Sequence, residues 1–374
     1  MRKILFLTIG DISKIATMKR ALGMANPMQK LGWDVSIIAM DCEENRRRIS
    51  RECNSTIKIN YYKDTSALNE SKDKTAIVNQ LKPDFIYICS YSIRNRIIKN
   101  LLTSCKPRLL VEYSELISSI NGISKARRWM HYYLEIKSIF YSDGLVCASQ
   151  YLNKYFKIKS TFFGKKKLPI LYSSYGYNKD IIDQPKKIFP TLKEKYNKII
   201  ILVYMGTMAK NYGLFTMLKA MLIISKSNKN VKLLLLGIGK DMLEAKEFVS
   251  VNNLHNYVEF LGYVPEDDIS SYLELADMFI SPLNNTIQDW ARCPSKIYMY
   301  LPFNKPILTC EIGEAKEIFK DEGYYFDNMK PETLSGLIEK TMDKKIIHQE
   351  VDIFQHAWTK RAEKLDSWLT ANFT

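Results

Sequence analysis

The strongest constraint on the fold is an alternation of strands and helices that occurs twice along the chain. Residues 3–9 predict a buried strand, residues 13–31 have helical periodicity, and residues 35–40 predict a second strand. Periodicity is lost around residues 178–198, which read as a linker, and the alternation restarts with a strand at residues 199–204. Such β-helix-β units build parallel sheets with right-handed crossovers.

The remaining elements continue this alternation in both halves of the chain. In the first half we expect further strands at residues 85–89, 108–113, 144–148 and 169–172, and a helix at residues 123–141. In the second half we expect strands at residues 231–236, 258–260, 278–280 and 306–309, helices at residues 214–225, 242–251 and 267–275, and helices at the C-terminus.

A chain of 374 residues, 46% of them hydrophobic, is long enough for two domains with separate cores. We predict an α/β fold of two Rossmann-like, doubly wound domains that face a cleft. The first spans residues 1–180 and the second residues 190–350, with a terminal helix at about 355–374 packing back on the first. Ligands bind such sheets at the carboxyl ends of the strands. The residues expected to face the cleft are Gly10, Gly206, Gly237 and Lys296.

Composition excludes several classes of protein. No apolar run approaches the ~20 residues of a membrane span, and the apolar start ends at Asp11 without a cleavage pattern, so we predict a strand there rather than a signal peptide. The seven cysteines include no C-x-x-C pair, which argues for reduced thiols in the cytoplasm and against a disulfide framework or a zinc site. Neither G-x-S-x-G, H-E-x-x-H nor D-x-D occurs, so we expect no hydrolase site and no bound metal.

The net charge of +15 is unevenly distributed. Residues 1–180 hold 31 basic and 15 acidic side chains, whereas residues 181–374 hold 24 and 25. A one-sided positive field suits an anionic partner, either a lipid leaflet or nucleic acid. The alternative is that these charges only solvate the surface.

The expected helix at residues 123–141 combines basic residues with several aromatic ones. Basic and aromatic side chains on one helix are typical of a helix that lies in a membrane interface. The same aromatic residues are equally compatible with a buried core. The residues concerned are Arg127, Arg128, Trp129, Tyr132, Tyr133, Lys137, Phe140 and Tyr141.

The segment of residues 276–306 contains the clearest candidate site. A strand at residues 278–280 is followed by a polar loop and by Pro294-Ser295-Lys296, where Ser295 can cap a short helix. A helix start offers backbone N–H groups and the positive end of a dipole, and Lys296 adds a full charge. We expect a phosphate site here; the alternative is an ordinary strand-to-helix turn with a solvated lysine.

A second candidate anion site follows the strand at residues 199–204. Gly206 permits close backbone approach, Thr207 supplies a hydroxyl and Lys210 a charge, although the loop lacks the Walker pattern. Residues 237–239, with sequence GIG, lack the third glycine of a dinucleotide fingerprint and predict a tight turn. Two anion sites at neighbouring strand ends suggest a bound diphosphate, which preorganised charges can stabilise as it departs.

Several short motifs follow one another along the chain in a specific order. They are Tyr204-Met205-Gly206-Thr207 with Gly213, residues 258–265 (VEFLGYVP), Ala276-Asp277, and residues 294–301 (PSKIYMYL) with Lys305-Pro306. In order and spacing they resemble the C-terminal donor domain of family-4-like glycosyltransferases with the GT-B fold. Residues 143–149 (DGLVCAS) resemble the last N-domain strand of that family, so the resemblance covers most of the chain.

This resemblance implies a retaining, metal-independent transferase that takes a sugar from a UDP- or GDP-linked donor and needs no other cofactor. It places the diphosphate at Gly206, Thr207, Lys210 and Lys296, the base against the backbone of Tyr263 and Val264, and further donor contacts at Pro294, Ser295 and Met299. The lysine usual in the family falls at Tyr212 here, two residues beyond Lys210.

The chain departs from the family pattern at a pair of glutamates. One of them, commonly a ribose ligand, falls on Met299, and its partner eight residues earlier falls on Ala291. Glu314 and Glu322 have the same spacing but lie beyond the motif, so we interpret them as coincidental. Asp289 is a candidate substitute for one hydroxyl contact. The loss leaves open an altered donor, weaker ribose recognition or an inactive relative.

Our first hypothesis is a cytoplasmic, peripherally membrane-associated glycosyltransferase that extends a lipid-linked saccharide for a cell-surface polysaccharide. Its basic N-terminal half would contact the acceptor's pyrophosphate and an anionic membrane surface. A catalytically inactive relative that binds other transferases and a nucleotide-sugar epimerase remain as alternatives; for nucleic acid, charge is the only support, and we expect none bound. Candidate catalytic residues are Lys296, Lys210 and Glu112, and Gly10 and His131 are candidates on the acceptor side. Glu115, like Glu112 and His131, is a candidate for the group that activates the acceptor.

Overall fold

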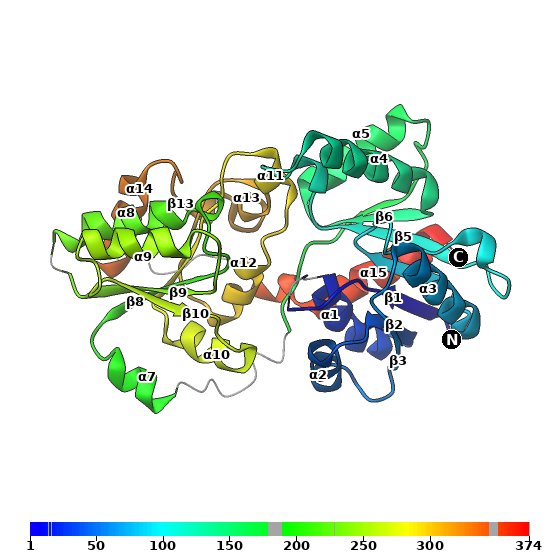
Figure 1. Ribbon diagram of the computed structural model, residues 1–374, viewed down its shortest axis with the longest axis horizontal. Helices are drawn as coiled ribbons and strands as arrows, with labels where there is room; N and C mark the ends of the chain where they lie inside the picture. The colour runs from blue at the N-terminus through cyan, green and yellow to red at the C-terminus, as the bar shows by residue number, and fades with distance from the viewer. Residues whose placement is uncertain (14, 16, 179–188, 228, 344–350, 374) are drawn as a thin grey trace. The chain divides into compact units, whose positions relative to one another are not determined.

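The computed structural model describes residues 1–13, 15, 17–178, 189–227, 229–343 and 351–373 of the chain. The chain forms two compact units, each with its own parallel sheet (Figure 1). The N-terminal unit comprises residues Met1–Lys179, Trp290–Cys293 and Phe354–Thr374, and the C-terminal unit comprises residues Asp180–Asp289 and Pro294–Ile353. The predicted α/β class with two doubly wound sheets is confirmed.

The N-terminal sheet has seven parallel strands in the order β3-β2-β1-β4-β5-β6-β7. The first strand, β1, lies in the interior of the sheet and pairs with β2 on one side and β4 on the other. The strands are β1 (Lys3–Leu7), β2 (Asp34–Met40), β3 (Lys58–Tyr62), β4 (Phe85–Cys89), β5 (Arg108–Tyr113), β6 (Gly144–Cys147) and β7 (Ile170–Tyr172).

Helices cover both faces of this sheet, because β1 alternates its side chains between two cores. Ile4 and Phe6 pack into a core with α1 and α15, whereas Leu5 and Leu7 pack into a core with α4 and α5. The helices are α1 (Thr17–Lys30), α2 (Glu43–Glu52), α3 (Ala67–Leu81), α4 (Lys125–Tyr141), α5 (Gln150–Phe162) and α15 (Trp358–Phe373), with short turns η1 (Lys99–Leu101), η2 (Ile117–Ser119) and η6 (Ile353–His356).

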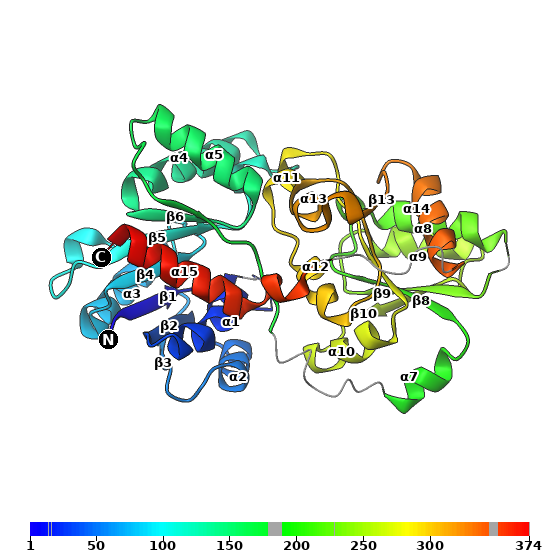
Figure 2. The same ribbon diagram turned by 180° about the vertical axis from the view of Figure 1, so that it is seen from behind.

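The C-terminal helix α15 packs against α1 of the N-terminal unit (Figure 2). Trp358 is buried against Gly23 of α1, where an added Cβ would lie 2.3 Å from the indole ring. Arg361 extends this contact by donating from Nε to the carbonyl of Tyr175 at 3.2 Å. The absence of a side chain at Gly23 thus allows the end of the chain to dock on its beginning.

The C-terminal sheet has six parallel strands in the order β10-β9-β8-β11-β12-β13. Its strands are β8 (Ile200–Met205), β9 (Val231–Leu236), β10 (Val258–Gly262), β11 (Met278–Ser281), β12 (Ile307–Thr309) and β13 (Tyr324–Tyr325). Its helices are α7 (Pro190–Lys195), α8 (Leu214–Ser225), α9 (Met242–Val251), α10 (Glu266–Leu275), α11 (Ile287–Ala291), α12 (Ser295–Tyr300), α13 (Gly313–Phe319) and α14 (Pro331–Met342), with turns η3 (Lys210–Tyr212), η4 (Leu301–Phe303) and η5 (Lys320–Glu322).

The structure corrects the linker prediction in part. Residues 179–188 lie outside the described residues, but α7 is a helix that begins at Pro190, within the stretch predicted to lack structure. Proline is well tolerated at the first position of a helix, because that N–H has no intrahelical partner. The sequence analysis also missed the edge strands β3 and β13. None of the helices formed by the described residues has the length and apolar character that crossing a membrane requires.

Candidate active site

The end of strand β8 forms the base of the candidate site. β8 lies between β9 and β11, and Gly206 directly follows its last residue. Gly206 has a φ of +155°, a conformation that favours glycine. A Cβ added to it would lie 2.9 Å from Nζ of Lys296. The strand end therefore accommodates the lysine because residue 206 has no side chain.

The Lys296 ammonium lies over an aromatic ring at the same strand end. Its Nζ is 4.2 Å from the ring centroid of Tyr204, the penultimate residue of β8. Tyr204 is fully buried, and its hydroxyl donates to the carbonyl of Thr207 at 3.1 Å. Two segments far apart in the sequence, predicted separately as anion sites, thus meet within the C-terminal unit. Tyr204 was quoted only as part of a motif, and its cation–π contact was not foreseen.

Buried aromatic side chains hold α12, the helix that carries Lys296. The ring of Tyr300 stacks on Phe279 of β11 with centroids 4.3 Å apart and an interplanar angle of 6°. The backbone N–H of Met205 donates to the Tyr300 hydroxyl at 2.9 Å. Burial raises the pKa of Tyr300 well above its ordinary value, so the phenol remains neutral. These contacts fix α12 against the end of β8.

The predicted cap of α12 is wrong. The helix begins at Ser295 itself, the N-cap position is Pro294, and no side chain caps the helix. The Tyr298 hydroxyl of this helix instead lies 3.4 Å from Oε2 of Glu314 on α13, and Glu314 is 1% exposed. Glu314, whose spacing the sequence analysis interpreted as coincidental, therefore contacts α12 through the Tyr298 hydroxyl. Packing rather than capping positions Lys296.

Two glycines of the β9–α9 turn pack against the loop that follows β8. A Cβ on Gly237, which has a φ of +136°, would lie 2.0 Å from the carbonyl oxygen of Gly206. A Cβ on Gly239 would lie 2.3 Å from the carbonyl oxygen of Met208. The Met208 N–H also donates to the carbonyl of Ile238 at 3.0 Å. The G-x-G sequence thus shapes the Gly206 loop by backbone-to-backbone packing, in addition to making a turn.

Two other candidates in this loop have different surroundings. Thr207 is exposed directly after Gly206. Lys210 forms an exposed ion pair with Glu244 of α9, with Nζ and Oε2 2.7 Å apart, and this hydrogen bond raises the pKa of Lys210. The Lys210 backbone N–H donates to Asp241 at 2.7 Å. The structure therefore brings Lys296 to Gly206 and directs Lys210 toward α9.

Asp289 is a structural carboxylate of the neighbouring loop. It is 2% exposed and accepts from the backbone N–H of Asn284 at 2.6 Å. The Asn284 amide in turn donates to the carbonyl of Asn211 at 2.7 Å and accepts from Asn328 at 2.7 Å. This network, which the sequence analysis missed, joins the loop before α12 to the loop after β8. In this structure Asp289 therefore holds Asn284 in place by accepting its hydrogen bonds.

The two positions that lack the family glutamates have different environments. Ala291 is fully buried in the core of the N-terminal unit, where its carbonyl accepts from the Ser149 hydroxyl at 2.6 Å. Met299 lies half-buried on α12 of the C-terminal unit. A glutamate at position 291 would place a carboxylate in an apolar core at high cost. Alanine at this position is thus explained by packing, whereas nothing in the structure explains methionine at position 299.

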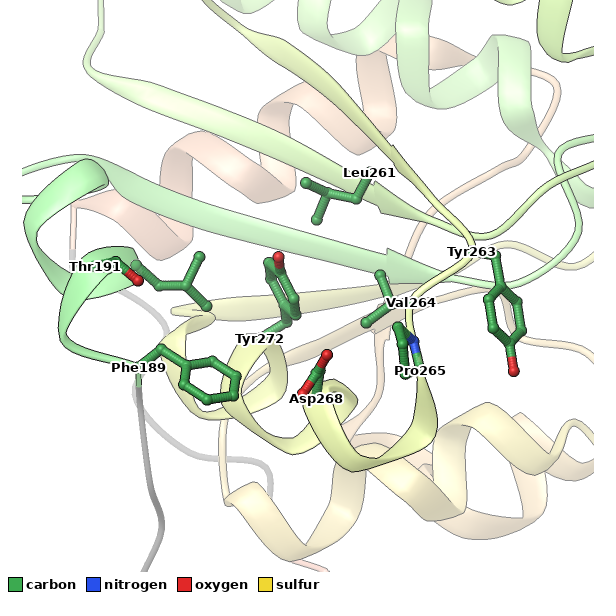
Figure 3. A pocket seen from close by; sticks show the side chains of 9 residues that line it. Phe189, Thr191, Leu261, Tyr263, Val264, Pro265, Asp268 and Tyr272 are labelled. Carbon is green, nitrogen blue, oxygen red and sulfur yellow. The ribbon is translucent and has the colours of Figure 1, made fainter.

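The expected base-binding segment adjoins a pocket of about 320 Å³ in the C-terminal unit. In Figure 3 the side chain of Val264 points toward Tyr272, whereas Tyr263 points away from the other labelled residues. Tyr263 is 64% exposed. The pocket lies between α7 and α10 and is lined by Phe189, Thr191, Leu192, Leu261, Tyr263, Val264, Pro265, Asp268 and Tyr272.

The acceptor-side candidates are dispersed in the N-terminal unit. Gly10, with a φ of +74°, donates its N–H to the hydroxyl of Tyr62 at 3.1 Å at the end of β1. His131 is half-buried on α4, and burial followed by the charge of Arg127 lowers its pKa. Neither has a contact that assigns a chemical role.

Glu112, a candidate catalytic residue, lies buried in an ion pair, which favours a structural role. It is 5% exposed, and Oε1 lies 2.5 Å from Nε of Arg20 on α1. Burial acts to lower the pKa of Arg20, but Glu112 together with Tyr87, Cys293 and Cys89 holds that pKa above its ordinary value. Burial raises the pKa of Glu112, an effect that Arg20 opposes. The two side chains therefore form a buried ion pair.

Comparisons with known proteins agree with this geometry. The model of the family described as "Glycosyl transferases group 1" matches residues 183–365, which include Gly206 and Lys296. This match, together with the solved structures described next, supports a GT-B glycosyltransferase. Among the described residues, no group of three or more His, Cys, Asp or Glu side chains could hold a metal ion.

Solved structures share the GT-B fold of this protein over nearly its whole length. Anabaena HepE in complex with UDP and glucose has a TM-score of 0.69 at 14% identity, covering 99% of this chain and 95% of that one. A glycosyltransferase from Rickettsia africae has a TM-score of 0.65 at 16% identity, with coverage of 99% and 96%. The lipopolysaccharide outer core galactosyltransferase WaaB has a TM-score of 0.65 at 9% identity, with coverage of 99% and 100%. No curated protein matches the chain in sequence.

Proposed function

We propose that this glycosyltransferase moves a sugar from a UDP- or GDP-linked donor to a saccharide acceptor, with retention of configuration and without a metal ion. The observation that carries the proposal is the position of Lys296 Nζ beside Gly206 and over Tyr204, at the end of a central strand. A strand end cleared of side chains and provided with a fixed cation suits a diphosphate. The complex of HepE with UDP and glucose is consistent with such a donor.

The proposed reaction breaks the bond between the anomeric carbon and the diphosphate oxygen. The nucleoside diphosphate leaves with the electron pair, the acceptor hydroxyl oxygen bonds to the anomeric carbon, and its proton passes to the departing phosphate. The Lys296 ammonium stabilises the charge that develops on the diphosphate, as preorganised cations do in low-dielectric sites. Gly206 and the Thr207 hydroxyl line the same strand end, and the backbone at Tyr263 and Val264 is the proposed contact of the base.

The proposed acceptor is a lipid-linked saccharide for a cell-surface polysaccharide, extended by a cytoplasmic enzyme bound peripherally to a membrane. The excess of basic residues in the first 180 positions supports an anionic surface as partner. WaaB, a protein of the same fold, is named for transfer to the lipopolysaccharide outer core. We propose no role for nucleic acid.

A second candidate function is a donor-binding protein without turnover that partners other transferases. The observation in its favour is the absence of both family glutamates, at Ala291 and Met299. The two candidates differ in turnover and agree in donor binding.

A nucleotide-sugar panel tests the proposal. Thermal shift with UDP- and GDP-sugars reports binding, since a ligand at 100 times its dissociation constant stabilises by about 2.7 kcal/mol. Release of the nucleotide with and without a lipid-pyrophosphate saccharide then reports transfer. Stabilisation with acceptor-dependent release supports a transferase, and stabilisation without release supports the binding protein. If no nucleotide sugar in the panel stabilised the protein, both the transferase and the binding-protein proposals would be contradicted.

A further inference from the structure

Two helices of the N-terminal unit present large apolar side chains to solvent. On α4, Trp129 is 71% exposed, Tyr133 60% and Phe140 51%. On α5, Ile158 is 68% exposed and Phe162 79%. Single exposed apolar residues are common on protein surfaces, whereas a contiguous group marks an interaction site.

The exposed residues of α4 form one stripe opposite its buried face. Trp129, Tyr133 and Phe140 are separated by four and seven positions, which places them above one another on a helix. The buried positions of the helix are Leu134, Glu135, Ser138 and Ile139. The stripe therefore points away from the core. Tyr141, at the end of the same helix, packs against the core instead, so the core interpretation applies to Tyr141 and does not explain the exposed Trp129, Tyr133 and Phe140.

Ring contacts join the exposed groups of the two helices into one surface. Phe163, which follows α5, has its ring centroid 6.1 Å from that of Phe140 and 5.1 Å from that of Phe162. Lys159 of α5 donates to the hydroxyl of Tyr132 of α4 at 3.0 Å. The two helices lie side by side in both views (Figures 1 and 2). We call the exposed residues Trp129, Met130, Tyr133, Phe140, Ile158 and Phe162 the α4–α5 face.

Every exposed charged residue in the segment that carries this face, residues 125–167, is positive. Residues 125–167, all of which the structure describes, contain ten Lys or Arg and two acidic residues. Of the two, Glu135 is 3% exposed and accepts from the Ser118 hydroxyl at 2.8 Å, and Asp143 is partly buried and pairs with Arg108. The exposed basic residues are Lys125, Arg127, Arg128, Lys154, Lys157, Lys165, Lys166 and Lys167.

We propose that the α4–α5 face binds the surface of an anionic lipid bilayer. Exposed Trp, Tyr and Phe side chains suit the headgroup level of a bilayer, and lysines without exposed acidic neighbours suit a continuous negative surface. The exposed basic residues lie on or directly after the same two helices as the apolar ones, so apolar insertion and charge attraction act on the same part of the unit. The inference rests on the proposed function in that a lipid-linked acceptor is reached at such a surface.

Vesicle sedimentation tests the inference with the full chain. The protein is expected to bind vesicles of phosphatidylcholine with phosphatidylglycerol, to bind much less to phosphatidylcholine alone, and to be released by salt. In a Trp129→Ala/Phe162→Ala variant, binding to the anionic vesicles should fall at least about tenfold, because two large apolar side chains no longer insert. The matched control is Leu243→Ala/Met329→Ala, which removes two side chains that are each 83% exposed in the other unit; its binding should not change.

Three outcomes would overturn the inference: wild-type protein that stays in solution with anionic vesicles, an unchanged double variant, or a dimer in sedimentation velocity that dissociates in the double variant. Thermal shift with nucleotide sugars, measured without vesicles, separates this inference from the proposed function. Protein that responds to a nucleotide sugar but ignores vesicles defeats the inference and the membrane-bound part of the proposed function, and leaves donor binding standing. Vesicle binding without a nucleotide-sugar response defeats the proposed transferase and leaves the inference standing. The Trp129→Ala/Phe162→Ala variant should keep the wild-type nucleotide-sugar response, because both substituted residues lie in the N-terminal unit and the proposed donor site lies in the C-terminal unit.

Discussion

Each unit places one cation near the end of a strand, and the surroundings of the two cations differ. Arg20 in the N-terminal unit is 3% exposed and paired with Glu112 of β5 in the interior. Lys296 in the C-terminal unit is half-buried, over the Tyr204 ring and beside Gly206. Glu112 neutralises the charge of Arg20, and this pair joins α1 to the sheet. Lys296 instead lies beside Gly206, a position that has no side chain. The comparison separates a charge used for stability from one that lies at the proposed donor site.

The largest effect should come from breaking the pair in the N-terminal unit. In Glu112→Ala, the Arg20 guanidinium would remain buried without its carboxylate, which costs about 3–5 kcal/mol when a buried pair is broken. Urea unfolding should show the loss as a lower midpoint. The control is Glu244→Ala, which breaks the exposed pair with Lys210 and should leave the midpoint nearly unchanged. A Glu112→Ala variant as stable as the control would return Glu112 to the catalytic candidates.

Much of the fold could be predicted from the sequence, because hydrophobic runs and glycine-ended strands alternate with helical periodicity. The central strands β1, β2, β4, β8 and β9 are buried on both faces and were predicted within a few residues. The edge strands β3 and β13 were not, because their side chains are mostly half-buried and carry a weak pattern. What identifies strands such as β3 and β13 is their pairing with a neighbouring strand, which is tertiary structure and leaves no local pattern in the sequence.

The candidate site was harder to predict because its parts meet through packing. The spacing of motifs selected Gly206 and Lys296 but could not show that the Tyr204 ring lies beside both of them. The predicted Ser295 cap is absent, and the helix is held instead by the stacking of Tyr300 on Phe279. The ion pair of Lys210 with Glu244 likewise depends on where α9 packs, and no local pattern encodes that.

The second largest effect should come from the cation of the C-terminal unit. In Lys296→Ala, affinity for the best nucleotide sugar should fall well over tenfold, since charge-assisted hydrogen bonds contribute roughly 1.5–3 kcal/mol. Stability in urea should change little, in contrast to Glu112→Ala. Titration calorimetry measures the affinity, with Lys219→Ala, an exposed lysine of α8, as control. Equal affinity of Lys296→Ala and Lys219→Ala would remove Lys296 from the donor site.

The glycine packing behind Lys296 allows a further test of the same site. In Gly237→Ala, the new Cβ would meet the carbonyl oxygen of Gly206, and the φ of +136° disfavours any side chain. We expect a loss of stability of ~1–3 kcal/mol together with weaker nucleotide-sugar binding. The control is Gly336→Ala on α14, where an added Cβ meets no atom within 4 Å and helix propensity improves. Nucleotide-sugar affinity that survives in Gly237→Ala would show that the Gly206 loop tolerates displacement and does not hold the diphosphate.

The smallest effect should come from Lys210, and it sharpens the distinction between the two lysines of the C-terminal unit. Because the Lys210 ammonium is exposed and paired with Glu244, Lys210→Ala should lower nucleotide-sugar affinity by less than about fivefold, as expected for exposed ion pairs. The same calorimetric titration compares it with Lys296→Ala, and Glu244→Ala reports whether releasing Lys210 raises the affinity. A loss as large as that of Lys296→Ala would mean that Lys210 leaves Glu244 when the donor binds. The diphosphate would then be held by two lysines, one placed by packing and one recruited by the ligand.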